Sequence, residues 1–419
     1  MRKRTLLHQA VVALLALALA ACGGGGSSSS TPAASDVGVT KDTITLGGTI
    51  ALSGPASAYG TIARASDAYF KYTNDHGGVN GRKIVYKYVD DAYNPAQTVP
   101  LTKQQVEQDQ VFLMYGGLGT QAQTSVREYL NTKKVPQVFV ATGATTFSAE
   151  HKKYPYTFGW QPTYQGESLI YAQYIQKNLP NAKIGVIYQN DDYGQDYLNG
   201  LVKGLGSKAN LIVDKQSNEV GAPDLGSQIL HLKSSGADTL FIFETPSPAI
   251  KSLVTAFKVN WKPTIFLNGV AAPMPYLFAA AKAAGTPAAV ESVWSVEYTI
   301  DPTDPQQASD AGVTQYRDVM QKYFPSGDLN DAFNVYGVAV AYTMVDVLKR
   351  AGANPTRKAV LDILNNLNET NPFLHKSVQV KNTSSDHYTI TQEILAKFDG
   401  TRYIPQSQVI DVRGQIKFP

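Results

Sequence analysis

From residue 44 onward the chain switches repeatedly between two spacings of its apolar residues. Short runs rich in Val, Ile, Leu and Phe, with the length of buried strands, occur eight times before residue 268. These expected strands are 44–50, 83–89, 111–115, 137–141, 183–188, 211–215, 239–243 and 264–267. Amphipathic stretches separate them, and the expected helices are 58–76, 95–108, 121–133, 165–178, 193–208 and 246–260. The alternation indicates parallel sheets that helices cover on both faces, so the predicted fold class is α/β.

The same strands fall into two groups of four, because Phe158-Gly159-Trp160-Gln161-Pro162 interrupts the alternation. Residues 37–419 also exceed what one hydrophobic core usually organises. Both observations favour two doubly wound parallel-sheet lobes.

The last third of the chain is expected to join these lobes. After Ala289 the pattern predicts a strand up to Tyr298, helices at 312–323 and 331–350, and tail strands at 377–380, 388–398 and 401–404 around an Asp399-Gly400 turn. The tail strands cannot complete a sheet locally, so we expect them to return to the earlier lobes and form a hinge. The predicted division is 41–159 plus 293–385 for lobe 1, and 160–292 plus 386–419 for lobe 2.

The first residues indicate export. Arg2, Lys3 and Arg4 precede an apolar run over residues 10–21, shorter than the ~20 residues that cross a bilayer as a helix, so residues 1–21 are predicted to be a signal peptide. Cys22, the single cysteine, follows two alanines in an arrangement that resembles a bacterial lipobox; the alternative is an ordinary signal peptide that happens to hold a cysteine.

A Gly/Ser-rich tract over residues 23–32 buries nothing, so residues 22–40 are expected to be a lipidated cysteine and a flexible tether. The globular part is then exported and anchored by lipid alone on the periplasmic or extracellular side of a bacterial membrane.

Charge excludes one class of partner. Three of the 37 Lys and Arg residues lie in the leader, so 34 remain against 34 Asp and Glu. Binding of nucleic acid depends on a net basic surface, and a nearly neutral mature chain argues against it.

Nothing in the sequence indicates catalysis, a cofactor or a metal. Six histidines, at positions 8, 76, 151, 231, 375 and 387, form no metal-binding spacing. No Gly-x-Ser-x-Gly motif occurs, and the acid pairs Asp90-Asp91 and Asp191-Asp192 follow expected strands, where acids usually cap helices. We therefore expect a protein that is not an enzyme and that has no cofactor or metal, and we expect it to be a monomer.

Several segments carry a family resemblance. Residues 45–60 read TLGGTIALSGPASAYG, residues 74–84 read NDHGGVNGRKI, residues 90–95 read DDAYNP and residues 191–194 read DDYG. In this order they resemble the leucine/isoleucine/valine-binding family of type I periplasmic binding proteins, over nearly all of the mature chain. The resemblance implies two lobes, a three-segment hinge, a ligand in the cleft between the lobes, and delivery to the membrane subunits of an ABC permease.

Candidate site residues lie in loops after the expected strands, where open α/β sheets bind ligands. In family members the loops corresponding to 116–120 and 141–145 hold a ligand carboxylate with backbone N–H groups and a hydroxyl. Thr120 and Thr142 match that pattern, together with Gly119, Ala141 and Gly143. A helix N-terminus attracts an anion because it has unpaired N–H donors and partial positive charge. Simple helix capping is the alternative role of both threonines.

Aromatic residues are expected on both sides of the ligand. Tyr59 and Tyr193 match family positions that lay a ring over the ligand, one from each lobe, with a core tyrosine as the alternative. Trp160, Tyr164 and Gln165 follow the first hinge crossing and are expected to line the second lobe's face of the cleft.

One departure from the family bears on the ligand. Amino-acid-binding members place an acid just after the strand corresponding to 264–267, to bind the ligand ammonium, but Asn268, Gly269 and Val270 stand there. Glu244 is a possible substitute from the preceding strand. Two ligand classes stay open: an α-amino acid held by Glu244, or an aromatic or aliphatic carboxylate without an amine, which the missing acid slightly favours. A sensory module without a permease is the alternative function.

Overall fold

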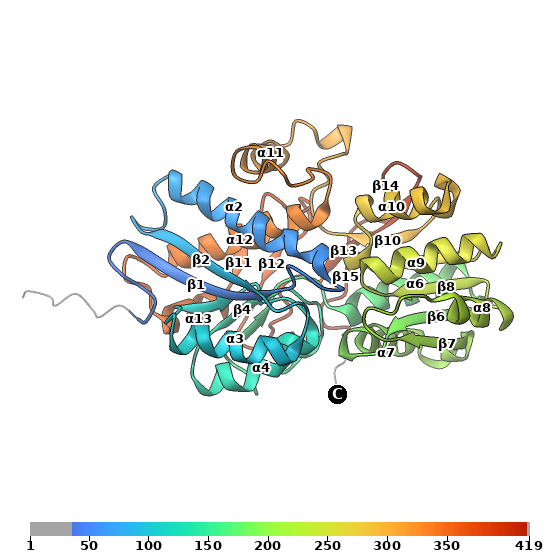
Figure 1. Ribbon diagram of the computed structural model, residues 1–419, viewed down its shortest axis with the longest axis horizontal. Helices are drawn as coiled ribbons and strands as arrows, with labels where there is room; N and C mark the ends of the chain where they lie inside the picture. Colours follow the sequence, from blue (N-terminus) through green and yellow to red (C-terminus); the bar gives the residue numbers. More distant parts are fainter. Residues whose placement is uncertain (1–35, 417–419) are drawn as a thin grey trace, which may run out of the picture. The chain divides into compact units, whose positions relative to one another are not determined.

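The computed structural model describes residues 36–416, which form two mainly parallel sheets with helices on both faces (Figure 1). The expected signal peptide, Cys22 and the Gly/Ser tract lie outside the described residues. Across residues 36–416 we find no helix whose length and apolar character suit a membrane span.

The first sheet has the strand order β2-β1-β3-β4-β5, and all neighbouring strands are parallel. Its strands are β1 (Thr43–Ile50), β2 (Lys83–Asp90), β3 (Leu113–Tyr115), β4 (Gln137–Val140) and β5 (Thr157–Gly159). The sequence predicts the first four within a few residues and misses β5. We call the part of the protein built on this sheet the first lobe.

Helices cover both faces of the first sheet. Two of them, α3 (Pro95–Glu107) and α4 (Thr120–Thr132), lie on one face, and α2 (Gly60–Asp75) and α12 (Ala332–Arg350) lie on the other (Figure 1). The lobe also contains η1 (Ser57–Tyr59), α5 (Thr146–Ala149), α11 (Ala311–Tyr323), α13 (Arg357–Leu364), β11 (Asn368–Glu369) and β12 (Val380–Lys381).

Close packing joins α2 and α12, which are far apart in sequence. The Ser66 hydroxyl donates a 2.8 Å hydrogen bond to the carbonyl oxygen of Gly337. A Cβ atom at Gly337 would lie 2.5 Å from the Ile62 carbonyl oxygen, so only glycine allows this approach.

The second sheet has the order β14-β13-β10-β9-β8-β6-β7, with β15 paired to β13. Its strands are β6 (Ile184–Gln189), β7 (Ile212–Asn218), β8 (Thr239–Phe243), β9 (Thr264–Leu267), β10 (Trp294–Glu297), β13 (Gln392–Phe398), β14 (Tyr403–Pro405) and β15 (Ile410–Asp411). The strands from β7 to β10 are parallel, and β13 returns antiparallel to β10. The expected hairpin at Asp399-Gly400 is confirmed by the antiparallel pair β13–β14.

Alternating residues of β8 pack on opposite faces of this sheet. Phe241 and Phe243 share a core with helices α6 (Tyr164–Asn178) and α7 (Asp192–Leu205). Leu240 and Ile242 share the other core with α8 (Gly226–Ser234), α9 (Pro246–Lys258) and α10 (Met274–Ala284). We call this part the second lobe; it also contains the short turns η2 (Gly206–Leu211), η3 (Gly269–Ala271) and η4 (Pro287–Ala289).

The chain passes between the two cores three times: after β5, after β10, and just before β13. Ile300 and Ile390 belong to the first core, whereas Val296 and Leu395 belong to the second. The boundary that we expected at residue 293 is therefore placed too early, because β10 pairs with β9 and β13 in the second sheet and the crossing follows Glu297.

Candidate functional site

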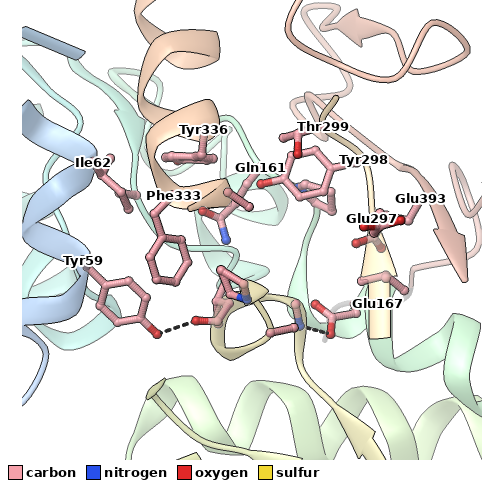
Figure 2. A pocket seen from close by; sticks show the side chains of 18 of the residues that line it. Tyr59, Ile62, Gln161, Glu167, Glu297, Tyr298, Thr299, Phe333, Tyr336 and Glu393 are labelled. Carbon is pink, nitrogen blue, oxygen red and sulfur yellow. Dashed lines mark hydrogen bonds between the residues drawn. The ribbon is translucent and has the colours of Figure 1, made fainter. Parts of the chain in front are cut away.

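A cavity of about 120 Å³ lies at the carboxyl ends of strands from both sheets, beside the crossing segments (Figure 2). A buried cavity of about 150 Å³ is large enough to hold benzene, so this volume suits a solute the size of one amino acid or one aromatic ring.

Residues of both lobes line the cavity. The first lobe contributes Tyr59, Ile62, Tyr93, Leu118, Gly119, Thr120, Ala141, Asn330, Ala332, Phe333 and Tyr336. The second lobe contributes Tyr164, Glu167, Tyr193, Thr245, Gly269, Val270, Ala272, Pro273, Met274, Val296, Glu297, Glu393 and Tyr403. The crossing segments contribute Gln161, Pro162, Tyr298, Thr299, Ile300, Asp301 and Pro302.

The start of α4 forms one polar part of the wall. Its N-cap residue, Gly119, has φ of 93° and provides no side-chain cap for the first N–H groups of the helix, and both Gly119 and Thr120 line the cavity. The hydroxyls of Thr120 and Thr142 lie 2.8 Å apart, and Thr142 in turn donates to the Tyr164 hydroxyl at 3.2 Å. This arrangement of donors suits an anionic group of a ligand.

Tyrosines from both lobes form the aromatic part of the wall. Tyr59 packs against Phe333 with ring centroids 4.9 Å apart and donates a 2.8 Å hydrogen bond to the Val270 carbonyl oxygen (Figure 2). Tyr193 meets the edge of Tyr164 at 5.2 Å. Burial raises the pKa of each of these tyrosine hydroxyls, so all stay neutral hydrogen-bonding groups near neutral pH.

Six of the eleven residues that the sequence proposes for the site line the cavity: Tyr59, Gly119, Thr120, Ala141, Tyr164 and Tyr193. Thr142 and Gly143 lie directly behind the wall, where Thr142 orients Thr120 and the Gly143 carbonyl accepts from the Tyr164 N–H at 2.8 Å.

Trp160 and Gln165 are not among the residues that line the cavity. Trp160 packs in the first lobe's core against Tyr336 and donates a 3.2 Å hydrogen bond to the Thr343 hydroxyl. Gln165 donates to Asp196 at 2.7 Å. The crossing segment thus turns its large side chain back into the first core instead of toward the cavity.

Glu244 is also outside the cavity lining. Its carboxylate is fully buried, accepts a 3.2 Å hydrogen bond from the Asn218 side chain, and does not line the cavity. Burial raises the pKa of the Glu244 carboxyl to about 8. Asn268, after β9, donates to the Tyr193 hydroxyl and to the Glu244 carbonyl oxygen, so it supports the aromatic wall from behind.

Four carboxyl groups that were not predicted from the sequence do line the cavity: Glu167 on α6, Glu297 at the end of β10, Glu393 on β13 and Asp301 in the second crossing segment, and Figure 2 labels the three glutamates. Glu167 accepts hydrogen bonds from the Tyr171 hydroxyl at 2.9 Å, the Tyr197 hydroxyl at 2.7 Å and the Gly269 N–H at 2.8 Å. Among these acids, only Glu297 stands at a position that the sequence analysis marks, near the end of the strand expected after Ala289.

Contacts between the lobes indicate a closed arrangement around the cavity. Besides the Tyr59–Val270 bond, the Tyr276 hydroxyl of α10 lies 3.4 Å from Asp331 Oδ2 at the start of α12. On the crossing side, the Asp196 carboxylate accepts from both the N–H and the hydroxyl of Thr145, each at 2.8 Å. Within residues 36–416, no three side chains of the metal-ligating types form a group that could hold a metal ion.

Two α/β lobes, three chain crossings and a cavity lined by both lobes are the architecture of a binding protein for a small solute. The family profile described as "Periplasmic binding protein" matches residues 43–400. The chain therefore belongs to the periplasmic binding protein family, whose members are extracytoplasmic receptors of transport systems and not enzymes.

Individual proteins are also similar to this chain, in sequence or in fold. The chain is 26% identical over 199 residues, 47% of its length, to the Leu/Ile/Val-binding protein homolog 3 of Brucella melitensis, and the match covers about half (53%) of that relative. A branched-chain amino acid ABC transporter protein from Thermus thermophilus with bound valine superposes with a TM-score of 0.78 at 18% identity, over 89% of this chain and 97% of that one. An ABC transporter solute-binding protein from R. palustris in complex with 4-hydroxybenzoate gives a TM-score of 0.72 at 18% identity, over 88% and 97%. These two structures bear on the fold alone.

Proposed function

We propose that this protein binds a small carboxylate-bearing solute in the cavity and delivers it to the membrane subunits of an ABC permease. The observation that carries the proposal is that Gly119 and Thr120, at the uncapped start of α4, line a cavity whose wall also contains aromatic side chains of both lobes. Such a helix end provides N–H donors and partial positive charge for an anion. The relatives named for branched-chain amino acids and the 4-hydroxybenzoate complex give two ligand classes of matching size.

Calorimetric titration tests this proposal with leucine, valine, phenylalanine, benzoate and 4-hydroxybenzoate. We expect at least one of them to bind, and the Thr120→Val variant to bind it roughly 10- to 100-fold more weakly, because a hydrogen bond to a charged group is lost. Thr124→Val is the matched control: it lies one turn further along α4, outside the cavity, and its hydroxyl bonds only to the Thr120 carbonyl oxygen. Equal affinity of the Thr120 variant and the wild type for every acid would contradict the carboxylate role.

We further propose that Cys22 carries the lipid anchor. Full-length protein made in a bacterial host is then expected in the detergent phase of a phase separation, and a Cys22→Ser variant in the aqueous phase. Recovery of both proteins in the aqueous phase would rule out the anchor.

A further inference from the structure

The first and third crossing segments lie against each other where they leave the first lobe. Thr389, just before the third crossing, donates a 2.9 Å hydrogen bond from its hydroxyl to the carbonyl oxygen of Gly159, the last residue of β5. Two residues before Thr389, the His387 ring stacks on Phe158 with centroids 4.6 Å apart and an interplanar angle of 21°. A change at His387 therefore acts on two of the three connections between the lobes.

The His387 ring is enclosed. The residue is 2% exposed, and a second imidazole, that of His151, packs on it with centroids 4.6 Å apart. The two imidazole planes meet at 34°, which is nearer to stacking than to the edge-on arrangement in which the N–H of one ring points at a nitrogen of the other. His151 is therefore a neighbour of the ring that cannot accept a hydrogen bond from it without moving.

One nitrogen of His387 has no partner. Its Nε2 atom lies 2.8 Å from Asn365 Oδ1, which is an acceptor, so the ring donates from Nε2 and the unprotonated nitrogen is Nδ1. Within residues 36–416, Nδ1 is buried without a hydrogen-bond partner. A proton taken up by His387 would thus create a buried N–H group with no acceptor in place, and such groups are costly.

The surroundings of the ring disfavour a positive charge. Burial lowers the pKa of His387 to about 4, and the nearby His151 contributes in the same direction. Asp386 acts in the opposite direction, but its carboxylate already forms an ion pair with Arg413 at 2.6 Å. The side chains that contact the ring from β5 and from the end of α13, Phe158 and Asn365, are uncharged.

The direction of the pH effect follows from proton binding. When the segment around His387 detaches from β5, water reaches the ring and its pKa returns to about 6.5. Between about pH 6.5 and pH 4 the detached form binds more protons than the packed form, so acid shifts the equilibrium toward detachment. From pH 7.5 to pH 5.0 this single group multiplies the detachment equilibrium constant roughly 25-fold. Above pH 7.5 it has no effect.

We propose that His387 makes the hinge acid-sensitive: its neutral ring holds the third crossing segment against β5, and protonation of Nδ1 in mild acid releases that segment. The geometry gives the ring both properties of a switch, because it packs across two crossing segments while neutral and has no acceptor for a second N–H. The inference goes beyond the proposed function. It is independent of which solute binds, so the test uses the ligand-free protein.

Hydrogen–deuterium exchange with mass spectrometry tests the proposal between pH 7.5 and pH 5.0. Exchange rates are divided by the intrinsic rate at each pH, so that they report the detachment equilibrium. We expect protection of the peptides that cover residues 156–160 and 387–391 to fall roughly 25-fold in the wild type. Constant protection would overturn the proposal. Protection that rises in acid would also overturn it, because a buried acceptor such as the unpartnered Asn382 amide would then bind the new N–H.

Two variants of His387 separate titration from packing. His387→Gln keeps an N–H donor for Asn365, and His387→Phe keeps a ring on Phe158, but neither side chain takes up a proton. In each variant that folds, protection of the same peptides is expected to change less than threefold between the two pH values, whatever its level at pH 7.5. A 25-fold fall that persists in both variants would show that another group is responsible and would overturn the assignment.

His231→Gln is the matched control. His231 lies on α8 in the second lobe, is mostly exposed and pairs with Asp214 at 2.7 Å. This variant also removes one titrating imidazole, and we expect it to keep the wild-type fall in protection at residues 387–391. Loss of the pH dependence in His231→Gln as well would mean that the effect is a property of the whole protein, and the role of His387 would be rejected.

Discussion

The Tyr59 hydroxyl and the Val270 carbonyl oxygen form a 2.8 Å hydrogen bond that joins the two lobes across the ligand cavity. Tyr59 stands at the end of η1 in the first lobe, and Val270 lies in η3, just after β9 of the second. Because the partners are on opposite sides of the cavity, the bond exists only when the lobes are closed. It therefore contributes to the free energy of closure as well as to the cavity wall.

Removal of this hydroxyl is expected to favour the open form. In Tyr59→Phe the closed state loses one hydrogen bond, of about 1 kcal/mol, so the apparent affinity for the solute should fall roughly fivefold. Small-angle scattering of the ligand-free variant should show a larger radius of gyration than the wild type. Tyr88→Phe, on β2 and outside the cavity lining, should change neither quantity. Identical scattering and affinity for Tyr59→Phe and wild type would show that the bond has no role in closure.

The stability of the ligand-free protein is expected to fall as the pH rises from 6.5 to 8.5. Burial raises the pKa of the Glu244, Glu297 and Glu369 carboxyls to about 8 and that of Glu167 to about 7, whereas in the unfolded chain they titrate near 4.5. Between these values the native state binds more protons than the unfolded state, so the free energy of unfolding decreases as the pH rises.

Thermal unfolding in this pH window measures the effect. His387, whose pKa burial lowers to about 4, is neutral in the native state but about half protonated in the unfolded chain at pH 6.5, so it opposes the slope near the lower end of the window and adds little above about pH 7.5. Because one histidine opposes four carboxyl groups, the net fall remains. Glu244→Gln and Glu369→Gln should each give a shallower fall of Tm with pH. A Tm that rises between pH 6.5 and 8.5 would be inconsistent with buried, protonated acids.

The Asp196 carboxylate is expected to be important for stability near the crossings. It accepts from the N–H and hydroxyl of Thr145 and from the Gln165 amide, and Asp196→Ala leaves these donors without a partner. The expected loss is about 2–4 kcal/mol in the free energy of unfolding, measured with urea. Asp192→Ala, an exposed position in the first turn of the same helix, should cost less than about 1 kcal/mol. Equal losses would mean that the bonds of Asp196 contribute little.

Gly337→Ala tests the packing of α12 on α2. The added methyl group would lie 2.5 Å from the Ile62 carbonyl oxygen, and backbone must move, at a cost of about 1–3 kcal/mol. Gly159→Ala is the control, since a methyl group there would lie 3.5 Å or more from its nearest neighbours, in Ser148 and Phe147, and the stability should stay within about 0.5 kcal/mol of wild type. The unfolding midpoint in urea distinguishes the two.

Strand order along the chain allowed much of the site to be predicted. In a parallel sheet, a loop after a buried strand must lie at the carboxyl edge, and Gly119, Thr120 and Ala141 are in such loops. Tyr59 and Tyr193 were identified by family resemblance, and both line the cavity. Most of the longer elements were predicted within a few residues, whereas β5, α8, α10 and α13 were missed. β5 pairs over three residues only, α8 and α13 are short helices of nine and eight residues, and α10 is alanine-rich.

The cavity acids were not predicted because their proximity depends on distant contacts. Glu297 and Glu393 line one cavity only because β13 returns antiparallel to β10, almost 100 residues later. Trp160 was misplaced for a similar reason: the residue that accepts its hydrogen bond, Thr343, lies on α12 in the last quarter of the chain. No local pattern around residue 160 distinguishes a side chain packed in a core from one facing a cleft.

The late position of α12 and β13 has a consequence for biogenesis. The first lobe lacks a main helix of its core until residue 350 is made, and the second lobe lacks β13, the strand that pairs with both β10 and β14, until residue 398 is made. Neither lobe can reach its native packing until most of the chain has been synthesised. A nascent chain of this protein is therefore expected to complete the packing of both lobes only near the end of synthesis.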